Sequence, residues 1–174
     1  MIGSTIVRTR RRLALGLAAA LLAAIPAALA VPAAAQGGDA KLDAIEQSAL
    51  DGVNAERRAA GLPALVCTPE LCRLARSFSR DMVERHYFGH QDPEGRRVDS
   101  RADAAGIHWR SVGENIARNR GFKDPATVAV REWMKSAGHR ENILDARYLE
   151  TGIGVWVSPD RTIYFTQVFI LRSQ

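Results

Sequence analysis

Apolar residues recur at helical spacing in two segments of the first half of the chain. The first segment, 41–60, carries one apolar stripe and ends at a glycine. Its stripe consists of Leu42, Ile45, Ala49 and Val53. The second segment, 69–86, repeats apolar residues at i, i+3, i+4, i+7 and i+11 with arginines between them. Those positions are Leu71, Leu74, Ala75, Phe78 and Met82. The pattern therefore predicts two amphipathic helices.

The pattern changes in the second half, where strand signals become frequent. A polar, glycine-bearing loop and a short helical turn lead to Gly106, and Asp124-Pro125 is a typical start of a helix. We expect Gly138-His139-Arg140 to interrupt that helix. The remaining expected elements are a strand over 110–117, a helix over 124–136, a further turn over 141–147, and strands over 152–157 and 162–171 joined by a turn at 158–161. Helices outnumber strands and the strands come late, which predicts an α+β domain with a small antiparallel sheet covered by helices.

The first thirty-five residues have the pattern of a signal peptide. Four arginines between positions 8 and 12 precede an apolar run over 13–29, and small residues at 28–30 and 33–35 each fit an A-x-A cleavage site. We therefore expect a cleaved signal peptide over 1–35, a flexible leader over 36–40 and one domain over 41–172. A permanent membrane span is the weaker interpretation, because no stop-transfer charges follow the run. The protein is then secreted or periplasmic.

Removal of this segment changes the charge balance of the chain. The full sequence has 24 Lys+Arg against 19 Asp+Glu, but four of the arginines and none of the acids lie in residues 1–35, which leaves 20 against 19. A nucleic-acid-binding surface needs a basic surplus. The composition thus argues against a nucleic-acid partner, and the domain's size is that of an ordinary monomer.

The sequence holds two cysteines, Cys67 and Cys72. An even count in an exported protein favours a disulfide, with two free thiols as the alternative. On a continuous helix their Cα atoms would lie roughly 8–9 Å apart, which is too far for a bond. A disulfide therefore requires Cys67 to precede the helix, and Thr68-Pro69 supplies an N-cap and a first helical residue at that boundary.

Common catalytic motifs are absent from the sequence: it contains no HExxH, GxSxG, phosphate loop or dinucleotide fingerprint. What it does contain is an ordered series of short motifs. They are Asn54-x-x-Arg57, Tyr87-Phe88-Gly89-His90, Gly113-Glu114-Asn115-Ile116-Ala117, Gly138-His139-Arg140-x-Asn142, Gly152-Ile153-Gly154-Val155 and Tyr164-Phe165-Thr166-Gln167. This series resembles the bacterial branch of the CAP superfamily, the SCP-like extracellular proteins, over about residues 42–171.

The resemblance implies a three-layer α-β-α sandwich and a cavity where two histidines and two glutamates converge. His90 matches the first cavity histidine, Glu114 matches the glutamate of the GEN motif, and His139 lies in the GHR segment. Tyr164 stands where animal and plant members have a histidine, and Glu132 is an uncertain match for the second glutamate. His90, His139 and Glu114 would then form a set that can hold a divalent metal such as zinc.

Each of these residues also has a simpler structural interpretation. His90 and His139 can hydrogen-bond backbone groups in loops, and Glu114 can bond exposed N–H groups. His86 and His108 carry no functional expectation. Arg96, Arg97 and Arg101 form a basic cluster whose simplest interpretation is a solvated loop face.

Three functions remain open at the level of sequence. The first is a non-catalytic binding module for a lipid, cell-wall or protein ligand, and we favour it. The second is a metal-dependent, peptidase-like hydrolase that uses His90, Glu114 and His139 as its catalytic cavity. The third is a structural envelope protein. The choice between the first two depends on whether a metal-bound water and a free base lie within hydrogen-bond reach of each other.

Overall fold

The computed structural model describes residues 2–8 and 33–173 of the chain. Two long helices come first in the domain, and most of the sheet follows. The helices are α1 (Ala33–Ala59), α2 (Pro69–Glu84), α3 (Val98–Ala104), α4 (Pro125–Lys135) and α5 (Ala137–Leu144). The strands are β1 (Ile2–Arg8), β2 (Val66–Cys67), β3 (Ser111–Asn119), β4 (Glu150–Val157) and β5 (Ile163–Leu171).

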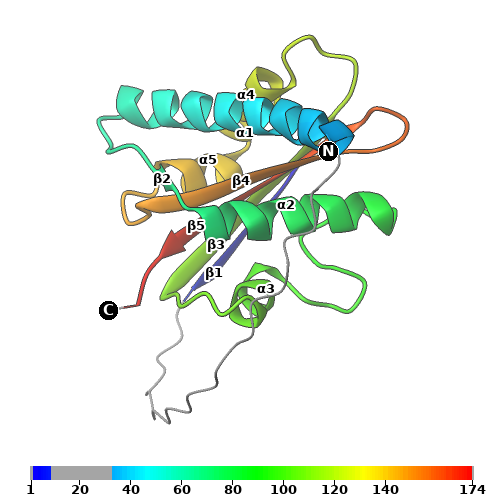
Figure 1. Ribbon diagram of the computed structural model, residues 1–174. Helices are drawn as coiled ribbons and strands as arrows, with labels where there is room; N and C mark the ends of the chain where they lie inside the picture. Colours follow the sequence, from blue (N-terminus) through cyan, green and yellow to red (C-terminus); the bar gives the residue numbers. More distant parts are fainter. Residues whose placement is uncertain (1, 9–32, 174) are drawn as a thin grey trace.

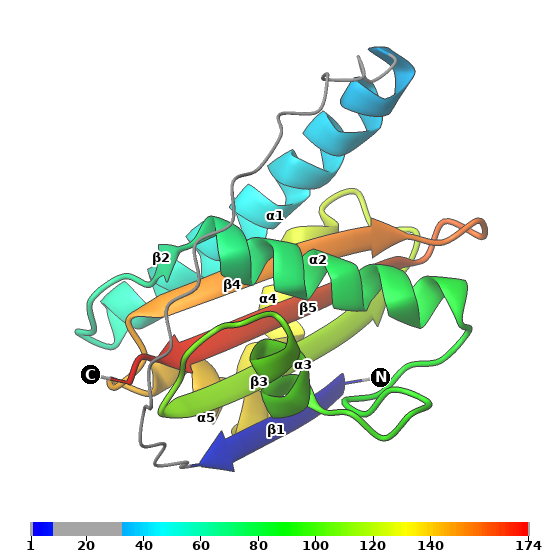
Figure 2. The same cartoon turned by 60° about the horizontal axis from the view of Figure 1, so that its bottom comes forward.

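The sheet forms the middle layer of three, with strand order β1-β3-β5-β4-β2. Its pairings are antiparallel except that the two residues of β2 lie parallel to β4. Helices α2 and α3 cover one face of the sheet, and α1, α4 and α5 lie on the other (Figures 1 and 2). This arrangement confirms the expected α-β-α sandwich.

Successive side chains of a strand point to opposite faces of the sheet, so the hydrophobic core has two halves, one on each face. Even-numbered residues of β3 and β5, such as Val112 and Val168, pack with Leu71 and Leu74 of α2. Odd-numbered residues, such as Phe165, pack instead with the helices of the opposite face. Whether a residue of β3 or β5 has an even or an odd number therefore tells which helical layer its side chain faces, and the same rule applies to the candidate site residues on β3.

Helix α2 lies unusually close to the sheet because β4 carries glycines beneath it. A Cβ added at Gly152 would lie 2.1 Å from the carbonyl carbon of Leu71, and one added at Gly154 would lie 1.9 Å from the backbone nitrogen of Arg76. The Gly152-Ile153-Gly154 motif thus sets the distance between this helix and the sheet.

The start of α2 confirms the expected disulfide geometry. Cys67 lies in β2, Thr68 is the N-cap, Pro69 is the first helical residue, and a disulfide joins Cys67 to Cys72 across a Cα–Cα distance of 6.9 Å. The Thr68 side chain, however, caps no backbone N–H. At α4 the N-cap works as expected, since Asp124 accepts a hydrogen bond from the backbone N–H of Thr127.

Arg57 of the Asn54-x-x-Arg57 motif ties α1 to the segment that follows α5. Its fully buried guanidinium donates to four backbone carbonyls and, among the residues that the structure describes, to no carboxylate. Those carbonyls belong to Pro63, Ile143, Asp145 and Tyr148. Burial lowers the pKa of Arg57, against the raising effect of nearby Asp145. The motif is therefore a structural tie.

Strands β1 and β2 were not expected, β3 and β4 are each two residues longer at one end than expected, and two helix boundaries also differ. The break after α4 falls at Ser136, and Gly138-His139-Arg140 lies inside α5 rather than interrupting a helix. Residues 36–40, expected as a flexible leader, lie within α1.

The predicted signal peptide falls largely outside the described residues, since 9–32 are not described. Residues 2–8 of that segment form β1, paired antiparallel with β3. No helix in the described part of the chain is long and apolar enough to cross a membrane.

Candidate functional site

His90 lies in the loop between α2 and α3, and buried Asp92 organises that loop. One carboxylate oxygen of Asp92 accepts from the backbone N–H groups of Glu94 and Arg96, at 3.1 and 2.8 Å, and the other accepts from the Arg96 side chain at 2.8 Å. Burial raises the pKa of Asp92, but these hydrogen bonds outweigh burial and hold it below the ordinary value. The ionised carboxylate thus fixes the turn that follows His90.

Glu114 lies in the middle of β3 and points toward the face covered by α2 and α3. Its side chain is 1% exposed, and its Oε1 lies 2.8 Å from His90 Nδ1. Because a carboxylate can only accept, Nδ1 carries the hydrogen. The other ring nitrogen, Nε2, is buried and has no hydrogen-bond partner among the described residues. In the neutral ring this nitrogen is an acceptor.

Arg101 of α3 completes the site. Its Nη2 donates to Glu114 Oε2 at 2.5 Å, and its Nη1 donates to the carbonyls of His90 and Arg96 at 3.2 and 3.0 Å. The guanidinium carbon lies 3.4 Å from the ring centroid of Phe78, a cation–π contact. The side chain is 10% exposed. The solvated interpretation of Arg101 was therefore wrong, because the guanidinium is buried against an acid and an aromatic ring.

His139 lies on the opposite face of the sheet. Its carbonyl accepts from Asn115 Nδ2 at 3.1 Å, and Asn115 also accepts from Asn142 Nδ2 at 2.9 Å. Successive strand residues point to opposite faces, so Asn115 faces α5 while Glu114 faces α2 and α3. The structure brings His90 and Glu114 together and separates both from His139.

The described side chains do not fit the metal site expected from the resemblance. They contain no group of three or more His, Cys, Asp or Glu residues placed to hold one ion. Tyr164, on the same face as Glu114, makes an edge-on ring contact with Phe88 at 6.0 Å between centroids. Glu132 of α4 pairs with Lys135 at 2.9 Å and lies outside the site. The two remaining histidines, His86 and His108, are exposed.

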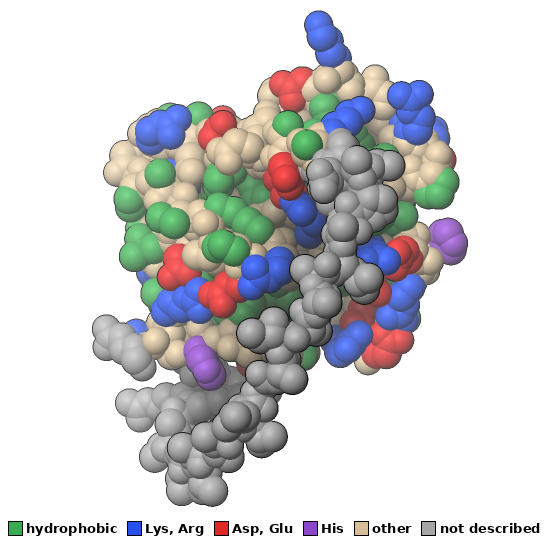
Figure 3. All heavy atoms as spheres, viewed as in Figure 1, with side chains coloured by type: hydrophobic (Ala, Val, Ile, Leu, Met, Phe, Trp, Pro, Cys, Tyr) green, Lys and Arg blue, Asp and Glu red, His purple; other side chains and the backbone are tan. Residues whose placement is uncertain are grey.

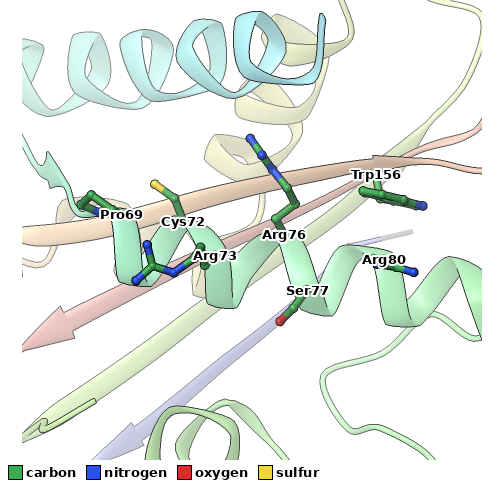
Figure 4. Close-up of a pocket in the computed structure, with 7 residues that line it drawn as sticks. All are labelled: Pro69, Cys72, Arg73, Arg76, Ser77, Arg80 and Trp156. Carbon is green, nitrogen blue, oxygen red and sulfur yellow. The ribbon is translucent and has the colours of Figure 1, made fainter. Parts of the chain in front are cut away.

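A hollow of about 410 Å³ opens elsewhere, on the outer surface of α2. It is lined by Pro69, Cys72, Arg73, Arg76, Ser77, Arg80 and Trp156 (Figure 4). Two of its arginines already have acidic partners: Arg76 pairs with Glu46 and Arg80 with Glu84. Acidic and basic side chains are also interspersed over the face shown in Figure 3. The hollow is thus an electrostatically balanced surface rather than a strong anion site.

Comparison with known proteins gives a consistent result. The profile of the cysteine-rich secretory protein family, CAP, matches residues 50–169. The uncharacterized protein YkwD of Bacillus subtilis is 38% identical over 113 residues, which are 65% of this chain and 43% of YkwD. The uncharacterized membrane protein YlbC of the same organism is 35% identical over 127 residues, which are 73% of this chain and 34% of YlbC. The chain thus spans less than half the length of these curated relatives.

Solved structures agree with the fold. An extracellular protein containing an SCP domain from Bacillus anthracis superposes with a TM-score of 0.70 at 26% identity, covering 83% of this chain and 45% of that protein. An outer surface protein from Borrelia burgdorferi superposes with a TM-score of 0.67 at 16% identity, covering 74% of this chain and 93% of that protein.

Proposed function

The chain belongs to the cysteine-rich secretory protein family, and from that premise we propose that it is an exported binding module rather than an enzyme. Its ligand, a lipid, cell-wall component or protein, would be recognised beside His90 and Glu114. The observation that carries this proposal is that both carboxylate oxygens of Glu114 are already engaged, by His90 and by Arg101.

That engagement disfavours the hydrolase alternative. A general base must lie within hydrogen-bond reach of the water or hydroxyl that it deprotonates. Glu114 is 1% exposed and held at both oxygens, so it is placed as a structural acceptor. The second histidine of the expected catalytic set lies beyond the sheet. Among the described residues, the site therefore offers the His90 imidazole as its one unpartnered acceptor, without the second histidine or an unengaged carboxylate of the expected set.

His90 Nε2 indicates the chemistry that a ligand would offer. A buried acceptor without a partner costs about 1–3 kcal/mol. A ligand hydroxyl or amide N–H bonded to this nitrogen would remove that cost. Carbohydrate, sterol and peptide ligands all carry such donors, and they fall within the three ligand classes proposed.

Ligand capture tests the proposal most directly. Protein purified from the native envelope would be analysed by mass spectrometry for co-purifying small molecules, with His90→Ala beside it and the exposed His108→Ala as matched control. We expect capture by the wild type and the His108 variant and loss in the His90 variant. Hydrolysis of a peptide and ester panel that disappears in His90→Ala would instead establish the enzyme.

Export is a separate part of the proposal and has its own test. The basic segment, apolar run and A-x-A sites support cleavage after Ala30 or Ala35. N-terminal sequencing of exported protein should return Val31 or Gln36, whereas Met1 or Ile2 would contradict cleavage.

A further inference from the structure

Glu114 supplies the negative charge of this site. It is the only carboxylate that contacts His90 among the described side chains, and its two oxygens are divided between His90 Nδ1 and Arg101 Nη2. A divalent ion placed at Glu114 would have to share a carboxylate whose negative charge the guanidinium already balances.

The guanidinium is held by more than this one ion pair. Its second nitrogen donates to the carbonyls of His90 and Arg96, and its carbon stacks over Phe78. A divalent ion would therefore meet a fixed positive charge within a few ångströms, in a site shielded from water where like charges repel strongly. It would also have to displace a cation that already makes three hydrogen bonds and a ring contact.

We propose that Arg101 is the permanent cation of this site: it takes the place at Glu114 that a divalent metal would hold, and it makes the site indifferent to metal ions. Arg101 neutralises the buried carboxylate, which otherwise would require a metal or a proton. By binding the His90 and Arg96 carbonyls, it also holds the loop that positions His90. This inference rests on the proposed function, which assigns ligand recognition to the same site.

Zinc titrations of the full chain as purified test this assignment. Thermal unfolding would be followed at about pH 7.5, where imidazoles are mostly neutral, with zinc chloride up to about 1 mM. The wild type should show no zinc-dependent shift of the melting temperature. Arg101→Ala frees one Glu114 oxygen beside His90 and should gain a shift of about 3–6 °C, as expected for a dissociation constant near 0.1 mM.

Two further variants make the result specific. Arg101→Ala/His90→Ala should lose the acquired zinc response, and Arg73→Ala, which removes an exposed arginine of α2, should behave as the wild type. Arg101→Gln, which is closer in size, serves the same purpose as Arg101→Ala where the alanine variant does not fold.

Two outcomes would overturn the assignment. One is a zinc response of the wild type that His90→Ala abolishes. The other is a folded Arg101 variant that gains no zinc response. Neither measurement depends on ligand capture, so failure of this inference is distinguishable from failure of the binding function.

Discussion

Replacement of Glu114 by glutamine should destabilise the protein strongly, although it changes only one oxygen to an amide. The substitution leaves the Arg101 guanidinium, which is 10% exposed, without its counterion. It also places the amide NH₂ against one of the two donors that Glu114 now accepts from, His90 Nδ1 or Arg101 Nη2. Breaking a buried ion pair by removal of one partner costs about 3–5 kcal/mol. For a domain of this size, where 1 kcal/mol corresponds to about 3–4 °C, the melting temperature should fall by roughly 10–20 °C.

A double-mutant cycle measures how much of that loss belongs to the pair. Arg101→Met removes the charge and keeps an apolar chain over the Phe78 ring. If the pair acts as a unit, Glu114→Gln/Arg101→Met should lose at least about 2 kcal/mol less than the sum of the two single variants. Denaturant unfolding gives each free energy.

The surface pair Arg80–Glu84 is the matched control, because its side chains are 56% and 53% exposed. Glu84→Gln should change the free energy of unfolding by no more than about 0.5 kcal/mol. Additivity within about 0.5 kcal/mol at Glu114 and Arg101 would refute the reasoning, since the two residues would then contribute independently.

Three other predictions concern the frame of the site. Replacing Cys67 and Cys72 with serine opens a short loop, so stability should fall by about 2 kcal/mol without loss of folding, and two free thiols in unreduced wild-type protein would contradict the bond. Gly154→Ala forces a Cβ into the α2 backbone and should cost at least about 3 kcal/mol, whereas Gly89→Ala, whose nearest atom would be 3.9 Å away, should cost little; equal unfolding free energies would contradict the close packing. The folded-state pKa of Asp92 is depressed, so its stabilisation is present above the unfolded value near 3.9 and is lost as pH falls through the lower folded value. Between about pH 5 and 2 the melting temperature of Asp92→Asn should therefore fall less than that of the wild type, and the remaining loss comes from other carboxyls with a lowered pKa, such as Glu94 and Asp124.

Much of the fold was predictable because its signals are local. The apolar stripe from Leu71 to Met82 predicted α2, and Thr68-Pro69 predicted where it begins. The expected break at Gly138-His139-Arg140 was wrong. The chain turns at Ser136 instead, and its backbone takes an extended conformation there that no glycine is needed to supply. Glycine is the more flexible residue, but flexibility alone does not select the position of a bend.

The candidate site was only half predictable, for reasons of geometry. His90 and Glu114 come together as the resemblance implied, but Arg101 was missed because a cluster of three arginines in a loop segment resembles a solvated surface. The signal that could have found it is spacing within α3. Val98 and Ala102 are the buried residues of this short helix, and Arg101 lies between them in sequence at the edge of their face. Its apolar stem can therefore follow them inward while its head reaches Glu114.

His139 and His90 are separated because neighbouring residues of strand β3 contact opposite helical layers. Glu114 points to the layer that holds His90, and its neighbour Asn115 points to the layer that holds His139. Gly113 faces the same side as Asn115, where an added Cβ would lie 3.1 Å from Asn142 Oδ1. Consecutive residues of the Gly113-Glu114-Asn115 motif thus contact both helical layers. Gly113 and Asn115 pack against α5 on one face of the sheet, and Glu114 binds His90 and Arg101 on the other face. Histidines from different motifs of the series therefore need not lie close together in space, because the sheet can separate them. The residue that completes the site comes from α3, on the same face as Glu114.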